Sequence, residues 1–213
     1  MPRLDPQKIS TLAVGWIGFL SIVTLVTLAQ TLPFRLTFVR PETFHAWFVR
    51  VELFFAVFLW PFFLPGLVRE GCGILGSLAA LGMMIVLAAP LTAAAANLSA
   101  APAGEALSGQ ILVGAAAAPA AALEELSRRA GWRRARAWYL LAAFFLSAVP
   151  PFAHFLLRDL AGRGDLSALA WASPFWAAAA APLPAAAVFA GLALAGLAAG
   201  LLWTPRMEAE VEA

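Results

Sequence analysis

The chain has 213 residues, of which 62% are hydrophobic and only 12% are charged, and its formal net charge is +2. In a soluble domain roughly a quarter of all residues are charged, so this composition excludes an ordinary soluble protein. The small net charge gives no reason to expect a nucleic-acid partner. Lys8, the only lysine, lacks the glycines of a phosphate-binding Walker loop, and the single cysteine, Cys72, excludes an internal disulfide framework and a thiolate metal site.

The apolar residues form runs long enough to cross a bilayer, for which about 20 residues are needed. These runs predict membrane helices at about 11–32, 44–68, 72–96, 106–123, 137–157 and 185–203. The run at 106–123 is the weakest of them because it consists mostly of alanine. We therefore expect an all-α, polytopic membrane helix bundle of about six transmembrane helices in one domain, residues 1–213.

The last apolar stretch has 40 residues without a charge, from Leu166 to Pro205, which is too long for one transmembrane helix. Pro182 and Pro184 divide it, so residues 166–181 are predicted to form a short half-inserted element before the last helix. Its tryptophans suit the headgroup boundary, where this residue type is enriched. Residues 206–213 are predicted to form an acidic tail.

The orientation follows from the arginines, because positively charged loops stay in the cytoplasm. Five arginines lie between the fourth and fifth predicted helices. Counting crossings from this loop places both termini in the cytoplasm of a multi-pass protein, which we expect in the cell inner membrane. Arg35 and Arg40 fall on the outer side and mildly oppose this orientation.

Arg50 and Glu52 lie inside the second predicted helix, roughly 9–12 Å from its start. A charge in the hydrocarbon costs about 2.5–3.5 kcal/mol on insertion scales and usually faces a partner or a cavity. The two residues are two positions apart, so they point to different faces. Either they line a path or anchor a partner helix, or Arg50 reaches the outer headgroups while Glu52 bonds a neighbouring helix.

His45 and His154 are the only histidines, and both fall near the outer ends of their predicted helices. Two imidazoles at matched depth are what bis-histidine haem ligation requires, so haem b is an alternative to the expectation of no cofactor. The other interpretation is two interfacial histidines bonded to water or headgroups. No Ser–His–Asp set, paired-carboxylate site or metal-ligand cluster can be assembled from the sequence, so we expect no enzymatic activity.

Charged residues at two predicted cytoplasmic turns are candidates for docking a soluble subunit or for contacting lipid. They are Arg69, Glu70, Arg128, Arg129, Arg133, Arg134 and Arg136. Arginines near a membrane attract anionic lipid by about 1 kcal/mol each, so these residues can also act only as topology and lipid determinants. In the last predicted helix, Gly191, Ala195 and Ala199, together with Gly196 and Gly200, form small-residue faces that suit close helix packing or dimerisation.

The order of these parts resembles the permease subunit of type-2 ABC exporters, a family that includes haem-exporter B subunits of similar length. The matching stretches are residues 58–71 (FLWPFFLPGLVREG), which end the second helix at a charged turn, and residues 172–203, where SPFW precedes the final helix. The family has a longer cytoplasmic coupling segment after the second helix than this chain does. The resemblance implies a dimer that works with a separate cytoplasmic ATPase.

Three functions follow as hypotheses. The chain is a permease-like subunit, a membrane anchor of an electron-transfer complex with haem or quinone near the histidines, or a structural subunit that packs against other membrane subunits. The expected partners are membrane lipid, other membrane subunits or a second copy, and a cytoplasmic ATPase.

Overall fold

The computed structural model describes residues 6–30, 43–67, 73–130, 134–160, 162, 171–180 and 182–211. Within these ranges the chain is helical apart from short turns, and it forms no strand. The predicted all-α class is therefore confirmed. The helical elements are α1 (Pro6–Gln30), α2 (Phe44–Phe54), η2 (Phe55–Leu59), α3 (Trp60–Leu67), α4 (Gly73–Leu98), α5 (Ala103–Ala130), α6 (Ala135–Phe155), η3 (Leu156–Leu160), α7 (Pro174–Ala180) and α8 (Pro182–Val211).

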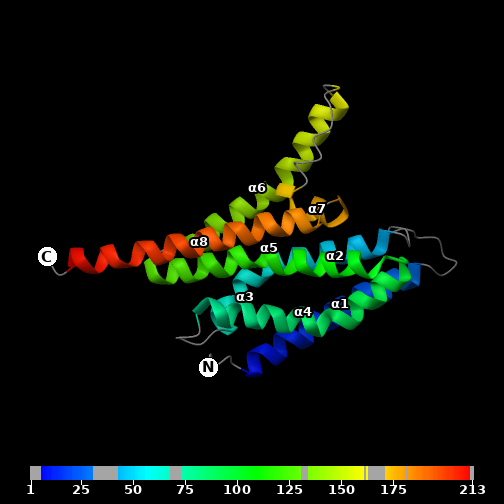
Figure 1. The fold of residues 1–213 in the computed structure, drawn as a ribbon. Coiled ribbons are helices and arrows are strands. Elements are labelled where there is room, and N and C mark those ends of the chain that lie inside the picture. Colours follow the sequence, from blue (N-terminus) through cyan, green and yellow to red (C-terminus); the bar gives the residue numbers. More distant parts are fainter. Residues whose placement is uncertain are drawn as a thin grey trace.

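Four helices in the described residues are long and apolar enough to cross a membrane, which is consistent with an integral membrane protein. These segments are Phe44–Phe63, Gly76–Leu98, Ala103–Glu124 and Ala135–Arg158. Ser10–Val26 and Pro182–Ala198 are shorter apolar helices. The predicted count of about six crossings is thus supported for four helices, and the first and last remain predictions. Figure 1 shows the consecutive long helices running in alternating directions, as a polytopic bundle requires.

The second predicted helix is one continuous rod with an irregular turn inside it. Helix α2 passes into the π turn η2 at Phe55, and α3 follows from Trp60. A π turn accommodates one extra residue and occurs frequently at functional sites. This π turn begins three residues after Glu52, so the carboxylate of Glu52 is a candidate functional group.

Helices α4 and α5 are joined by a tight turn at residues 99–102. The N–H of Ala101 donates to the carbonyl of Ala96 (2.9 Å), and the N–H of Ala100 donates to that of Asn97 (3.2 Å). Ala100 has a positive φ of 51°. This combination is a Schellman motif, which satisfies the last carbonyls of α4 and reverses the chain at once.

Helix α5 lies at the centre of the bundle and contacts α2, α3, α4, α6, α7 and α8. Its alanines explain this position, because small side chains let helix backbones approach closely in a membrane. Its most extensive contact is with α8, through Ala185, Ala186, Phe189 and Ala193, all of which are buried. The alanine-rich run that is weakest as a hydrophobic signal is therefore the core of the bundle.

Two of the small residues that the sequence suggested as a packing face of the last helix lie on the surface of the described part of the chain. Gly191 and Ala195 are exposed, and a Cβ built at Gly191 would meet nothing within 4 Å. The side chains of Ala199 and Gly200 lie outside the described residues. Helix α8 also differs in extent, since it begins at Pro182 and continues to Val211, through most of the predicted tail.

Helix α6 leaves the rest of the bundle at an angle (Figure 1). Only 11% of its apolar segment is buried, against 50% of that of α5. Large apolar side chains such as Trp138, Phe144 and Phe152 are exposed along it. In water such a helix would be an aggregation site, whereas lipid or a membrane partner can cover it. The helix runs through Pro150 and Pro151 and ends one π turn later.

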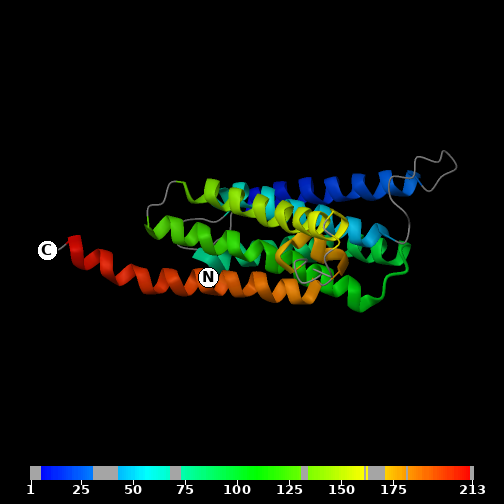
Figure 2. The same ribbon diagram turned by 90° about the horizontal axis from the view of Figure 1, so that it is seen from above.

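Helix α7 is the described part of the element predicted at 166–181, of which residues 166–170 and 181 lie outside the described ranges. Its seven residues are too few to cross a membrane. It contacts α2, α6 and α8, and Ser173 and Ala177 are fully buried. The predicted short element before the last helix thus packs into the bundle. Figure 2 shows it from above, beside the start of α8.

Gly109 sets how closely α2 and α5 approach. A Cβ at this position would lie 2.9 Å from Cγ2 of Val49, a fully buried side chain. We expect Gly109→Ala to destabilise the protein by about 1–3 kcal/mol, because α2 must shift to relieve the overlap. The thermal unfolding midpoint in detergent measures this effect.

Gly82→Ala is the matched control, because a Cβ at Gly82 meets nothing within 4 Å. Alanine has the higher helix propensity, so this control should be neutral or stabilising by up to about 1 kcal/mol. Equal midpoints for the two variants would show that the close approach of α2 and α5 does not exist.

Candidate functional site

A polar cluster inside the bundle has the carboxylate of Glu52 at its centre. Glu52 is 1% exposed, although it lies in the middle of the apolar segment Phe44–Phe63. The amide Nε2 of Gln110 on α5 donates to Oε2 of Glu52 at 2.5 Å. The hydroxyl of Thr92 on α4 lies 3.5 Å from Oε1, and the carbonyl of Ala88 is its nearer acceptor at 3.2 Å. Three helices therefore meet at one carboxylate.

The depths of the three residues agree. Glu52 is eight residues from the start of α2, Thr92 six from the end of α4, and Gln110 seven from the start of α5. At a rise of 1.5 Å per residue these separations are about 12, 9 and 10 Å. The cluster thus lies well inside a hydrocarbon core of about 30 Å, nearer to the end that carries the α4–α5 turn.

Arg50 points away from this cluster. Its Nε donates to the main-chain oxygen of Phe175 on α7 at 3.0 Å, and its side chain is half-buried. The two intramembrane charges thus have different partners, as their spacing predicts. Arg50 fixes the short helix α7 against α2, whereas Glu52 joins α2 to α4 and α5. The contact of Glu52 with neighbouring helices is compatible with both interpretations given above, and Arg50 bonds α7.

His45 lies on the same face of α2 as Glu52, two turns nearer to the end of the bundle. It is 3% exposed, and its Cε1 would be 3.6 Å from a Cβ at Gly109. Its Nε2 has no hydrogen-bond partner among the described residues. The ring of His154 packs edge-on against Trp176 with centroids 4.5 Å apart, and its Nδ1 likewise has no partner in the described chain.

The two histidine rings have different neighbours in the described residues. His45 is packed against α5, and His154 is packed against Trp176 of α7, which itself contacts both α2 and α6. Four cavities between the described helices have neither ring in their linings. Each ring does keep one buried nitrogen without a partner, so the haem alternative stays a prediction with a direct test.

Of the predicted docking residues, only two have described side chains. Arg134 is exposed just before α6. Arg136 forms a bidentate ion pair with Glu124 at 2.8 and 2.7 Å, which ties the end of α5 to the start of α6. Arg128 and Arg129 lie in the last turn of α5 without described side chains, whereas Arg69, Glu70 and Arg133 lie outside the described residues.

Gln110, Thr92 and Gly109 belong to the site and are not among the residues singled out from the sequence. Gln110 carried a signal, because it is the only amide and there is no charged residue in the run 106–123. Gly109 carried none, since a glycine in an alanine-rich helix looks like any other small residue. Only the packing of α2 against α5 shows its role.

Comparison with protein-family models, with curated proteins and with solved structures finds no match to this chain. The resemblance to type-2 exporter permeases therefore rests on the sequence features described above and stays a prediction.

We expect the purified protein to show no Soret band, because each histidine ring is packed against a different helix. An absorption spectrum after expression with supplemented haem measures this. A Soret band that disappears in both His45→Ala and His154→Ala would contradict the expectation and establish bis-histidine ligation. A band that survives both substitutions would indicate haem that is bound without the two histidines. The spectrum after haem extraction is the reference for the protein without haem.

Proposed function

We propose that the chain is a membrane-embedded transport subunit, the permease-like component of an exporter that works with a separate cytoplasmic ATPase, and that it is not itself an enzyme. The observation that supports this is the buried carboxylate of Glu52, held between three apolar helices by Gln110 and Thr92. An ionisable residue inside a membrane segment marks, by default, a substrate or ion pathway.

Energetics favour a functional role over a purely structural one. Placing a carboxylate at this depth costs about 2.5–3.5 kcal/mol on insertion scales. Interhelical hydrogen bonds in membranes contribute about 0.6 kcal/mol each on average, so the contacts with Gln110 and Thr92 do not offset this cost. An apolar side chain of similar volume would hold the three helices together at least as well. The carboxylate is therefore better explained by what it binds than by what it stabilises.

The arrangement of the helices also supports a docking surface on one side. Helices α4 and α5 pack together and run in opposite directions, so the start of α4 and the end of α5 lie at the same end of the bundle. The charged turn around Arg69 precedes α4, and the arginine-rich segment follows the last turns of α5. We assign this end, together with the start of α1 and the end of α8, to the cytoplasmic side of the inner membrane.

A pathway for a polar substrate requires that water reach the cluster. We expect Thr92→Cys, in a Cys72→Ser background, to react with a small water-soluble thiol reagent about tenfold faster than Ala88→Cys, because thiol reaction needs a hydrated thiolate. Both positions are buried on the same face of α4, one turn apart, and only Thr92 contacts Glu52. Equal, slow labelling would mean that the cluster is sealed packing, as in a structural subunit.

The ATPase partner has its own test. We expect affinity purification in mild detergent to bring down a nucleotide-binding protein, and replacement of Arg128, Arg129, Arg133 and Arg134 by alanine to release it. Removing four rim charges slows association and weakens its salt dependence. Arg136 is left intact because its ion pair with Glu124 joins α5 to α6.

A variant with Arg35, Arg40, Arg158 and Arg163 replaced by alanine is the matched control, because it removes the same charge from the end predicted to face outwards. It should retain the ATPase. If both variants retain the ATPase, the arginine segment is excluded as the docking surface. If both variants lose it, binding depends on the net charge of the chain and not on this segment.

A further inference from the structure

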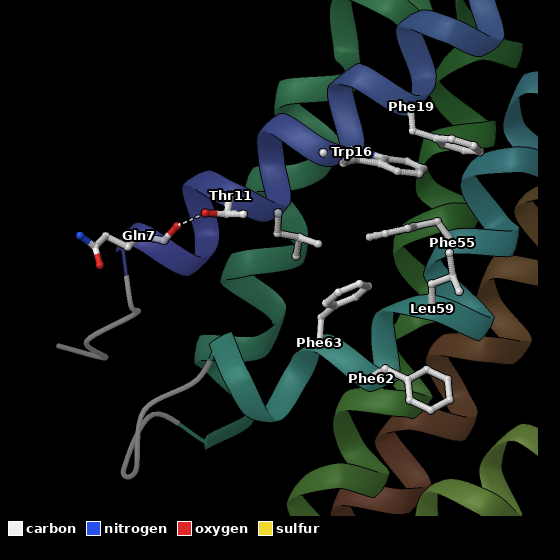
Figure 3. Close-up of a pocket in the computed structure, with 10 residues that line it drawn as sticks. Gln7, Thr11, Trp16, Phe19, Phe55, Leu59, Phe62 and Phe63 are labelled. Carbon is white, nitrogen blue, oxygen red and sulfur yellow. Dashed lines mark hydrogen bonds between the residues drawn. The ribbon is translucent and has the colours of Figure 1, made fainter.

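A long apolar groove lies between α1 and the η2–α3 part of the second helix, on the side of the bundle away from α8. Its volume is about 760 Å³, within the range of about 300–1,000 Å³ that is usual for ligand sites. Figure 3 shows the aromatic side chains of Trp16, Phe19, Phe55 and Phe63 gathered around it. It is open on one side, so a ligand can enter laterally.

The walls of the groove are formed by aromatic rings that stack on one another. Trp16 and Phe55 stack with ring centroids 4.1 Å apart, and Phe63 stacks on Phe55 at 6.1 Å. These rings form a continuous apolar wall that joins α1 to the second helix. On α1, beside Trp16 and across from Phe55 and Phe63 on the second helix, Gly15 lines the groove without a side chain, and a Cβ built there would meet nothing within 4 Å. The absence of a side chain at Gly15 keeps the groove free.

The length of the groove matches one leaflet of a bilayer. Its lining on α1 runs from Gln7 to Phe19, which is about 18 Å along the helix. Half of a hydrocarbon core of about 30 Å is about 15 Å. On the other wall, the lining residues Phe55 to Phe63 occupy the second half of the apolar segment Phe44–Phe63. Both walls therefore span a single leaflet.

The two ends of the groove differ in polarity. Gln7 and Thr11, in the first turns of α1, are its only polar lining residues. The Thr11 hydroxyl donates to the carbonyl of Gln7 at 2.9 Å, which anchors this polar end (Figure 3). Lys8 follows Gln7 directly in the first turn of α1. An apolar groove one leaflet long, with a lysine next in sequence to its polar end, suits an amphiphile with one aliphatic chain inside and an anionic headgroup outside.

We propose that this groove binds an anionic phospholipid, with one acyl chain lying between Gly15 and the aromatic wall and the headgroup near Lys8. The acyl chain gains contact with Trp16, Phe55 and Phe63, and the headgroup gains a cation at the interface. This site is separate from the cluster around Glu52, so it stands or falls independently of the transport function.

The test measures the lipid retained per chain by mass spectrometry, after purification in nonionic detergent and addition of dioleoyl-phosphatidylglycerol or dioleoyl-phosphatidylcholine. Gly15→Leu fills the groove, whereas Gly18→Leu adds the same side chain to the same helix at a position that does not line it and also meets nothing within 4 Å. We expect wild type and Gly18→Leu to retain phosphatidylglycerol, and Gly15→Leu to retain at least about fivefold less.

The Lys8→Gln variant tests the contribution of the lipid headgroup separately from that of the acyl chain. It should lower the retention of phosphatidylglycerol to the level of phosphatidylcholine and leave the latter unchanged. Unfolding midpoints of the delipidated variants confirm that each one folds. Equal retention by Gly15→Leu and Gly18→Leu overturns the site, and equal retention of the two lipids by wild type overturns the anionic headgroup. A disulfide-linked dimer through Gly15→Cys, in a Cys72→Ser background, would show that a second copy fills the groove instead.

Discussion

The satisfaction of one carboxylate inside an apolar bundle constrains the rest of this structure. Glu52 cannot hydrogen-bond to lipid, so α4 and α5 must present Thr92 and Gln110 at the same depth. That requirement ties the three helices to one longitudinal register. The close approach of α2 to Gly109 fixes their separation. The tight turn at Ala100 then holds α4 and α5 in the register that the carboxylate needs.

The bundle divides into a packed centre and a loosely attached periphery. Helix α5 is surrounded by neighbours, and its alanines pack against those of α8. Helix α6, by contrast, is mostly exposed, and its contacts with the bundle include the Arg136–Glu124 ion pair at its start and the hydrogen bond from the Ser173 hydroxyl to the carbonyl of Ser147. A membrane protein can afford this arrangement because lipid covers an apolar helix as well as another helix does. Most of the surface of α6 is thus available to lipid or to another subunit.

Much of the fold is legible in the sequence, because hydrophobic runs and prolines are local signals. They predict the helical class, the second to fifth helices to within a few residues except at the ends of α5, and the short element before the last helix. These local signals do not predict features that depend on which helices are neighbours. Alanine contributes little to hydrophobicity, so the run at 106–123 looks weakest although it forms the centre. The partners of Glu52 and the role of Gly109 depend on which helices are neighbours, and no spacing along one chain specifies that. Gly191 shows the converse, since it belongs to a small-residue motif but is exposed in the described part of the chain.

The π turn at Phe55–Leu59 has a consequence for the orientation of the side chains around it. In an uninterrupted α-helix Leu59 would lie seven positions after Glu52, on the same face, but Leu59 is 39% exposed and Trp60 is fully buried. The additional residue shifts the phase of the helix by one position, roughly 100°. Beyond the turn, η2 and α3 still contact α5, while Leu59, Phe62 and Phe63 line the groove beside α1. The additional residue thus lets one rod hold Glu52 inside the bundle and line a separate groove further along its length.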